Sequence, residues 1–149
     1  MSDRVFVDTN ILVYAYDRSE PDKQKRAVEV MDALVTTDNG VISTQVLAEF
    51  FISVTRKIKA PLSVAEAYQR LEALVQAWTV VELSSFVPLE AARGVRDYQF
   101  HFWDAQIWAT ARLSHVPLVL SEDFNTSSTI EGVRFENPLI PSFDLNQWL

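Results

Sequence analysis

Short apolar runs alternate with amphipathic stretches along most of this chain. The runs cover residues 5–7, 41–42, 78–81 and 118–120, and a fifth covers 133–135. Runs this short, rich in valine, isoleucine and aromatic residues, are typical of strands. Strands separated by helices favour a parallel sheet with helices on its faces. The alternation therefore predicts an α/β fold with a central, mostly parallel sheet of about five short strands, and places 133–135 at its edge.

Capping residues and helical spacing predict what lies between the strands. Residues 8–10 offer N-capping side chains to a short helix over 11–16, and Pro21 fits the start of a helix over 23–37. Ser43 or Thr44 caps the next helix, and Ser63 with Glu66 has the form of a capping box. Two more helices are expected at about 87–98 and 103–114. The polar residues 125–129 are expected to form a loop.

Length and composition limit the class of protein. The 149 residues fit one domain, 1–149, which would bury roughly 70% of its unfolded surface. Cysteine is absent, which is compatible with a reducing cytoplasm. Neither a secretory signal nor an uncharged stretch of about 20 residues is visible. We therefore expect a cytoplasmic protein without a membrane segment.

The net charge of −7 also narrows the choice of function, because 20 acidic residues outnumber 13 basic ones. This balance argues against a passive nucleic-acid binder that relies on a broad basic face. It does not exclude a nuclease, since metal ions can carry much of the positive charge at the reacting centre.

Four acidic residues stand at or next to the ends of apolar segments. Asp8 directly follows the first predicted strand, and Asp123 follows the fourth with two residues between; Glu49 and Asp104 lie near the beginnings of helices. Strand carboxyl ends and helix N-termini meet at one edge of a parallel sheet. Carboxylates that converge there repel one another unless a cation is bound, and oxygen ligands suit Mg²⁺ or Mn²⁺. We expect Asp8 and Asp104 to bind the ion directly, and Glu49 and Asp123 directly or through water.

Each acid also has an ordinary interpretation. Asp8 could be only a helix cap, Asp104 could be stabilised by the helix macrodipole alone, and Asp123 could belong to a turn. Glu49 could point to solvent from an amphipathic helix. The placement common to all four favours the metal site, and hydrolysis of a phosphodiester is the reaction that such a site suits.

Four short motifs occur in order along the chain: Val7-Asp8-Thr9-Asn10, residues 45–50, Phe102-Trp103-Asp104-Ala105 and Ser121-Glu122-Asp123-Phe124. With them the chain resembles PIN-domain ribonucleases, and within these the VapC-like toxins of toxin–antitoxin pairs, over nearly its whole length. The resemblance implies a three-layer α/β/α sandwich that cleaves RNA endonucleolytically with Mg²⁺ or Mn²⁺.

The resemblance also implies roles for particular residues and partners. Asp8, Glu49, Asp104 and Asp123 become the active-site acids. Thr9, Asn10 and Ser121 become the side chains that orient carboxylates or waters. Such toxins are usually homodimers, and a cognate antitoxin silences them by inserting a segment into the acidic groove.

Candidate substrate contacts lie outside these motifs or beside them. His101 could contact a phosphate or move a proton, although a histidine on the surface or in packing is the simpler interpretation. Arg93 and Arg96 share a predicted helix and could line the groove. Basic clusters at 23–26 and 56–59 could follow an RNA backbone or form solvated helix faces. Trp103 could stack on a base, but core packing is favoured.

Other functions fit the sequence less well. A phosphoacceptor receiver domain requires a lysine after its fifth strand, and no lysine follows Lys59. A haloacid-dehalogenase-like phosphatase requires a second aspartate two residues after the first aspartate, and Asn10 occupies that position after Asp8. An RNA-processing nuclease without an antitoxin and a non-catalytic acidic α/β binding module stay open as alternatives to the toxin.

Overall fold

A computed structural model describes residues 3–149. Along the chain its elements are β1 (Val5–Val7), α1 (Thr9–Tyr14), α2 (Pro21–Thr37), β2 (Gly40–Ser43), α3 (Thr44–Arg56), α4 (Val64–Ala77), β3 (Thr79–Val81), α5 (Phe86–Tyr98), α6 (Phe102–Leu113), β4 (Leu118–Leu120), β5 (Ser128–Ile130), β6 (Val133–Glu136) and α7 (Leu145–Trp148).

The strands form one sheet in the order β3-β2-β1-β4-β6-β5. Every neighbouring pair is parallel except β5 and β6, which are antiparallel. The chain proceeds outward from β1 through β2 to β3, and then returns to place β4 on the other side of β1. The strand order therefore reverses between β1 and β4, and the expected mostly parallel sheet is confirmed with six strands in place of five.

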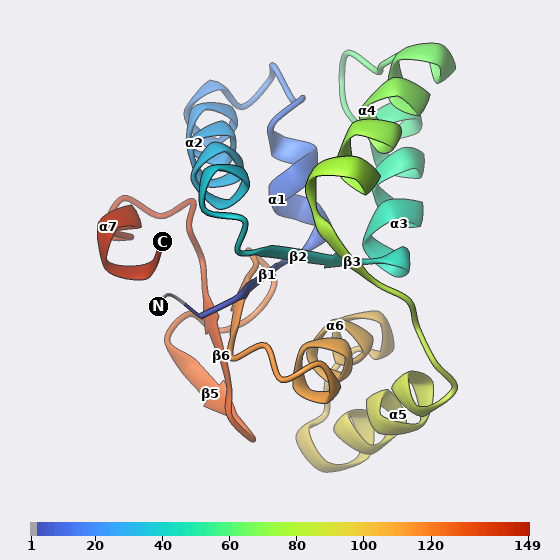
Figure 1. The fold of residues 1–149 in the computed structure, drawn as a ribbon, viewed down its shortest axis with the longest axis vertical. Coiled ribbons are helices and arrows are strands. Elements are labelled where there is room, and N and C mark those ends of the chain that lie inside the picture. Colours follow the sequence, from blue (N-terminus) through green and yellow to red (C-terminus); the bar gives the residue numbers. More distant parts are fainter. Residues whose placement is uncertain (1–2) are drawn as a thin grey trace.

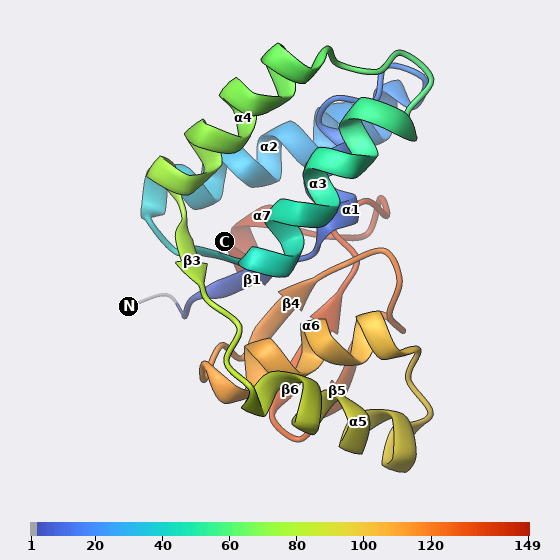
Figure 2. The same cartoon turned by 90° about the vertical axis from the view of Figure 1, so that its right-hand side faces the viewer.

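Helices cover both faces of the sheet. Figure 1 shows α1 to α4 on one side of the first three strands and α5 and α6 on the other. Figure 2 shows the same two groups after a turn of the molecule, with α5 and α6 running together below the sheet. This arrangement confirms the three-layer α/β/α sandwich.

The burial of the strands follows from this covering. Every residue of β1, β2 and β4 is buried, whereas the edge strand β3 is only half-buried. Because central parallel strands face helices on both sides, they read as continuous apolar runs. Within residues 3–149, no helix has the combination of length and apolar character that crossing a membrane requires.

The capping residues fix where helices begin. The side chain of Ser43, and not that of Thr44, accepts a hydrogen bond from the backbone N–H of Val46 at the start of α3. The capping box of Ser63 and Glu66 is present at the start of α4, as predicted. The short first helix begins at Thr9, two residues earlier than expected, because Asp8 is its N-cap residue.

The prediction that 133–135 forms an edge strand is wrong. This strand, β6, lies between β4 and β5, and the edge is formed by Ser128–Ile130, which the polar composition had suggested to be a loop. Glu131 and Gly132 connect the two strands with φ of 49° and 83°. Two successive residues with positive φ are what a tight two-residue hairpin requires. The short helix α7 was also not predicted.

Gly94 of α5 lies where this helix packs closely against α6. A Cβ at this position would lie 2.8 Å from Cζ3 of Trp108 on α6, and the Trp108 side chain is fully buried. We expect Gly94→Ala to lower the stability by about 1 kcal/mol or more, or roughly 3 °C in Tm, although alanine favours helix formation. Thermal unfolding followed by circular dichroism measures this, with Leu89→Ala on the exposed face of α5 as the control. A rise in Tm would contradict the packing argument.

Candidate active site

The reversal of strand order places the ends of β1 and β4 side by side. The backbone N–H of Asp8 donates a hydrogen bond of 3.0 Å to the carbonyl oxygen of Leu120, just beyond the last paired residues. Asp8 therefore begins where β1 ends, and Ser121 to Asp123 begin where β4 ends. In open parallel sheets this is the position at which ligands bind.

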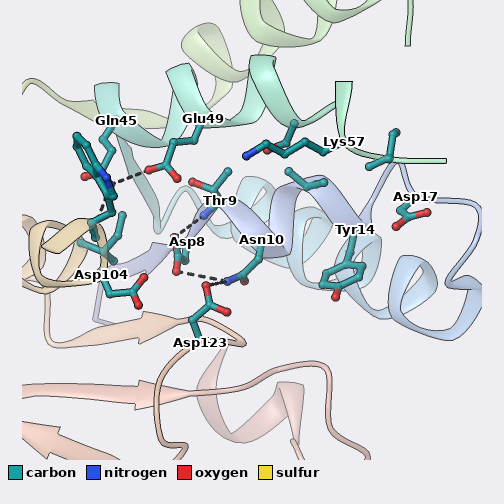
Figure 3. Close-up of a pocket in the computed structure, with 15 residues that line it drawn as sticks. Asp8, Thr9, Asn10, Tyr14, Asp17, Gln45, Glu49, Lys57, Asp104 and Asp123 are labelled. Atoms are coloured by element: carbon teal, nitrogen blue, oxygen red, sulfur yellow. Dashed lines mark hydrogen bonds between the residues drawn. The ribbon is translucent and has the colours of Figure 1, made fainter. Parts of the chain in front are cut away.

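Three of the four predicted acids converge at this position. One oxygen from each of Asp8, Asp104 and Asp123 lies within 4.8 Å of the others, although the three residues are far apart in the sequence. Asp104 enters from the first turn of α6. Glu49, from the second turn of α3, is outside this triad but lines the same cavity, whose volume is about 330 Å³. Figure 3 shows the four carboxylates facing the space around Asp8.

Asn10 and Ser121 hold two of these acids in place. The Ser121 hydroxyl donates to Oδ2 of Asp8 at 2.7 Å and accepts from the backbone N–H of Asp123 at 3.0 Å. Nδ2 of Asn10 donates to Oδ2 of Asp123 at 3.0 Å, while its Oδ1 accepts from the backbone N–H of Glu122 at 3.2 Å. The two side chains thus link the end of β1 to the end of β4.

Burial makes the negative charge on these acids costly. The pKa of Asp8 is raised to about 7, chiefly by burial and also by the neighbouring Asp123 and Asp104, against the hydrogen bonds from Ser121 and Thr9 that lower it. Burial also raises the pKa of Asp104, with Asp123 and Glu49 adding to the effect and His101 opposing it. In the absence of a cation, Asp8 therefore holds a proton over much of the acidic pH range.

Thr9 contributes through its backbone and also leaves a hydroxyl without a partner. Its N–H donates to Oδ1 of Asp8 at 2.7 Å. Its Oγ1 is buried beside the cavity and forms no hydrogen bond with any group of residues 3–149. The backbone N–H of Thr9, and not its hydroxyl, therefore contacts the carboxylate of Asp8.

This set of groups fits a hard divalent cation. The convergent ligands are carboxylate oxygens, the kind that Mg²⁺ and Mn²⁺ prefer. A cation would offset both the mutual repulsion and the burial that raise the pKa of Asp8. The unpartnered hydroxyl of Thr9 adds a polar group that a bound water could satisfy.

Gln45 is a residue of the site that the sequence interpretation missed. Its Nε2 donates to Oε1 of Glu49 at 2.6 Å and to the carbonyl oxygen of Trp103 at 3.2 Å, and its Oε1 accepts from Gln106 at 3.0 Å. Gln45 therefore fixes Glu49 and connects α3 to α6. Its spacing of four residues from Glu49 on one helix was the available signal.

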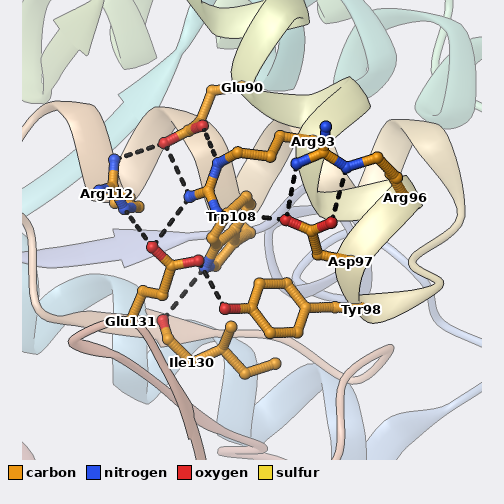
Figure 4. A network of polar contacts seen from close by, with 9 residues as sticks. All are labelled: Glu90, Arg93, Arg96, Asp97, Tyr98, Trp108, Arg112, Ile130 and Glu131. Atoms are coloured by element: carbon orange, nitrogen blue, oxygen red, sulfur yellow. Dashed lines mark hydrogen bonds and ion pairs between the residues drawn. The ribbon is translucent and has the colours of Figure 1, made fainter.

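Two of the predicted substrate contacts lie away from the cavity. Arg93 binds Glu90 at 2.6 Å and Glu131 at 2.9 Å, and Arg96 binds its neighbour Asp97 at 2.7 Å. Figure 4 shows these pairs as part of a network that also includes Arg112. Neither arginine lines the cavity, so the expectation that they line the groove is not met.

The network instead joins the lower helices to the hairpin between β5 and β6. Glu131, in the hairpin turn, accepts hydrogen bonds from Arg93 on α5 and from the Tyr98 hydroxyl at 2.6 Å. These contacts lower the pKa of Glu131 to about 2. Arg112 of α6 pairs with both Glu131 and Glu90. The network therefore fixes α6, the helix that carries Asp104.

His101 and Trp103 flank the start of α6. His101 is exposed, precedes the helix and does not line the cavity, so its contact with substrate stays a prediction. Trp103 does line the cavity and is 56% exposed. The interpretation of Trp103 as a core residue is wrong. The fully buried tryptophan of α6 is Trp108.

Lys57 and Tyr14 complete the rim. Lys57, at the end of α3, is a basic residue that lines the acidic cavity. The Tyr14 hydroxyl donates to Glu122 at 2.7 Å, and Lys23 pairs with the same carboxylate at 2.7 Å. Of the two basic clusters, the one at 56–59 thus contributes a residue to the cavity, whereas Lys23 is engaged in an ion pair.

Comparison with known proteins agrees with the fold. The family model described as PIN domain matches residues 5–129, and the chain belongs to this family. The resemblance noted in the sequence is confirmed. No curated protein gives a significant sequence match to the chain.

Several solved structures share the fold at low sequence identity. A chain of a toxin–antitoxin complex from Klebsiella pneumoniae has a TM-score of 0.66 and 18% identity, covering 90% of this chain and 97% of that chain. VapC20 of Mycobacterium tuberculosis, a toxin that cleaves the sarcin–ricin loop, has a TM-score of 0.60 and 16% identity, with coverages of 85% and 97%. DNA-bound VapBC from Salmonella typhimurium has a TM-score of 0.63 and 17% identity, with coverages of 93% and 99%.

The raised pKa of Asp8 predicts how the stability of the metal-free protein depends on pH. The carboxyl loses its proton near pH 3.8 when unfolded but near 7 when folded, so the folded state binds more protons between these values. Stability therefore falls as the pH rises through this window, and the penalty is complete above about pH 7. Its upper limit is roughly 4 kcal/mol.

We therefore expect Asp8→Asn to be more stable than the original protein at pH 8 in a chelator, and the difference to shrink toward pH 4. Thermal unfolding over this pH range measures it. Added Mn²⁺ should raise the Tm of the original protein more than that of the variant, since the ion binds the ionised carboxylate. Equal pH dependence in both proteins would contradict the assignment.

Proposed function

We propose that this protein is a metal-dependent endoribonuclease that hydrolyses RNA phosphodiester bonds with Mg²⁺ or Mn²⁺. The observation that carries the proposal is the convergence of Asp8, Asp104 and Asp123 at the point where the strand order of a PIN-domain fold reverses. The pKa of Asp8 is raised to about 7, chiefly by its burial. Strongly shifted pKa values of this kind are typical of catalytic sites, and this favours an enzyme over a binding module without catalysis.

In this proposal Asp8, Asp104 and Asp123 hold the cation, with Glu49 as a further ligand directly or through water. When bound, the ion supplies positive charge that orients a phosphate and lowers the pKa of water. Asn10 and Ser121 keep Asp8 and Asp123 in position through the hydrogen bonds that bridge them. These bonds preorganise the carboxylates, so that less rearrangement is needed when the substrate binds.

In this proposal Glu49, where it does not bind the ion directly, would accept a proton from the attacking water. Its Oε1 is held by Gln45 at 2.6 Å, while its Oε2 accepts no hydrogen bond from the part of the chain that the structure describes. A carboxylate with one oxygen fixed and the other open to the cavity can take up a proton without changing its orientation.

We further propose that the nuclease is the toxin of a type II toxin–antitoxin pair and acts in the cytoplasm as a homodimer. The support is the fold shared with toxin–antitoxin complexes from Klebsiella pneumoniae and Salmonella typhimurium and with the cleaving toxin VapC20. The proposed partner is a cognate antitoxin that inserts a segment into the acidic cavity. A housekeeping RNA-processing nuclease is the alternative within the same fold.

Cleavage of RNA tests the activity directly. With Mn²⁺ or Mg²⁺ we expect the purified protein to cut members of a panel of structured RNAs, and Asp104→Asn to reduce kcat at least roughly 100-fold because a ligand to the cation is lost. Asp32→Asn, which changes an exposed acid on α2, is the matched control and should cleave normally. Cleavage that persists in excess chelator would rule the mechanism out.

Growth of the expressing bacteria separates a toxin from a processing enzyme. We expect induction of the original chain to arrest growth, and induction of Asp104→Asn to the same protein level, checked by immunoblot, to leave growth unaffected. The reason is that arrest by a toxin depends on cleavage of cellular RNA. Normal growth with both proteins would favour the processing nuclease, and arrest with both would show that toxicity does not come from this site.

A further inference from the structure

A second cavity adjoins the acidic one. It has a volume of about 580 Å³ and shares four of its lining residues with the acidic cavity, which are Gln45, Glu49, Lys57 and Trp103. Because the two cavities share walls, a molecule with one group among the carboxylates can extend directly into the second space.

The walls of this second cavity suit a flat, apolar group. Trp103 is 56% exposed, which is unusual for the largest apolar side chain, and Ala48 and Leu83 line the same space. The indole is oriented by an edge-on contact with Phe102 at 5.3 Å between ring centres. Its backbone carbonyl is held by Gln45. The exposed aromatic ring thus lies at the rim of the acidic cavity, with its backbone held by Gln45 and its ring in edge-on contact with Phe102.

Polar groups at the border of this space still have hydrogen-bonding capacity. Within residues 3–149, the side-chain oxygen of Gln106 accepts no hydrogen bond, although the residue is 94% buried and its Nε2 is engaged with Gln45. The Thr44 hydroxyl forms no hydrogen bond among the same residues, and both side chains line the cavity. These acceptor and donor groups can recognise the edge of a heterocycle.

Lys57 provides the charge between the two spaces. Lys57 lines both cavities and forms no ion pair with the acids of residues 3–149. It therefore lies where a phosphate that joins two nucleotides would pass from the acidic cavity to the apolar one. A single lysine at this border can bind one backbone phosphate, whereas a long stretch of RNA backbone would need several basic residues.

We propose that the second cavity binds one unpaired base of the RNA strand, stacked on Trp103, next to the nucleotide whose phosphate is cleaved. The edge of the base contacts Gln106 and Thr44, and Lys57 binds the connecting phosphate. This inference rests on the proposed nuclease function and adds a subsite to it. Stacking on an aromatic face with hydrogen bonds to the base edge is how proteins recognise single-stranded RNA.

The test uses three variants of the whole protein. Trp103→Ala removes the aromatic face, Trp103→Phe keeps one, and Tyr68→Ala removes an aromatic ring that is 63% exposed on α4, away from both cavities. The probe is the best cleaved single-stranded RNA of about ten nucleotides. It is used intact or with a single abasic position at each place around the cut.

Binding is measured by fluorescence anisotropy with Ca²⁺ in place of Mg²⁺, because Ca²⁺ takes the same oxygen ligands with a looser geometry. Cleavage is measured with Mg²⁺. We expect Trp103→Ala to raise Kd and KM roughly 5- to 150-fold with a smaller change in kcat. Trp103→Phe should stay within a few-fold of the original protein, and Tyr68→Ala should equal it.

The abasic RNAs identify the subsite. At one position, removal of the base should weaken binding to the original protein and have no further effect on Trp103→Ala, because the two changes remove the same contact. Additive effects at every position, or equal losses with Trp103→Phe and Trp103→Ala, would overturn the inference. So would a change in molecular mass on sedimentation of Trp103→Ala, which would mean that a second copy of the chain covers the cavity. If the original protein neither binds nor cleaves any RNA, the proposed function itself fails.

Discussion

The burial of Asp8 between two other acids is the constraint on which the site depends. Asp8 is 5% exposed, and one of its carboxylate oxygens lies within 4.8 Å of an oxygen of Asp104 and an oxygen of Asp123. Hydrogen bonds from Ser121 and Thr9 offset part of the cost of this charge but leave its pKa at about 7. A fold selected for stability alone would place a neutral residue there. The remaining cost is what a divalent cation would offset, so the arrangement makes chemical sense as a binding site prepared for one.

The two helical layers each contribute one wall of that site. Glu49 comes from α3 above the sheet, and Asp104 comes from α6 below it. Gln45 joins the two walls through its bonds to Glu49 and Trp103. The lower wall is fixed from behind by the ion-pair network of Arg112 with Glu90 and Glu131, which anchors α6 to the β5–β6 turn. The network therefore supports the position of Asp104 without taking part in the cavity.

Local sequence patterns predicted much of this structure, and the features that they did not predict have physical reasons. Asp8 and Asp123 were visible because each follows an apolar strand, but their convergence depends on the strand order, which no local pattern specifies. The exposure of Trp103 and the burial of Trp108 depend on which face of α6 packs on α5, a tertiary property. The hairpin at Glu131 and Gly132 was missed because β5 is polar and its connection lacks the usual asparagine or aspartate before glycine. The ion pair of Arg93 with Glu131 could not be predicted from a local pattern, since Glu131 is distant in sequence.

The acidic character of the chain bears on how it could hold a polyanion. Among the residues described, five of the 13 basic side chains form ion pairs with acids of the same chain: Lys23, Arg93, Arg96, Arg112 and Arg134. Lys57 lines the cavity without such a pair, and little other positive charge faces the carboxylates. If the proposed nuclease function is correct, attraction of RNA to this site would therefore come mainly from a bound cation and from contacts that do not depend on charge. An exposed indole beside the acids supplies a contact of that second kind, which explains why a protein with a net charge of −7 could bind a single strand without a basic face.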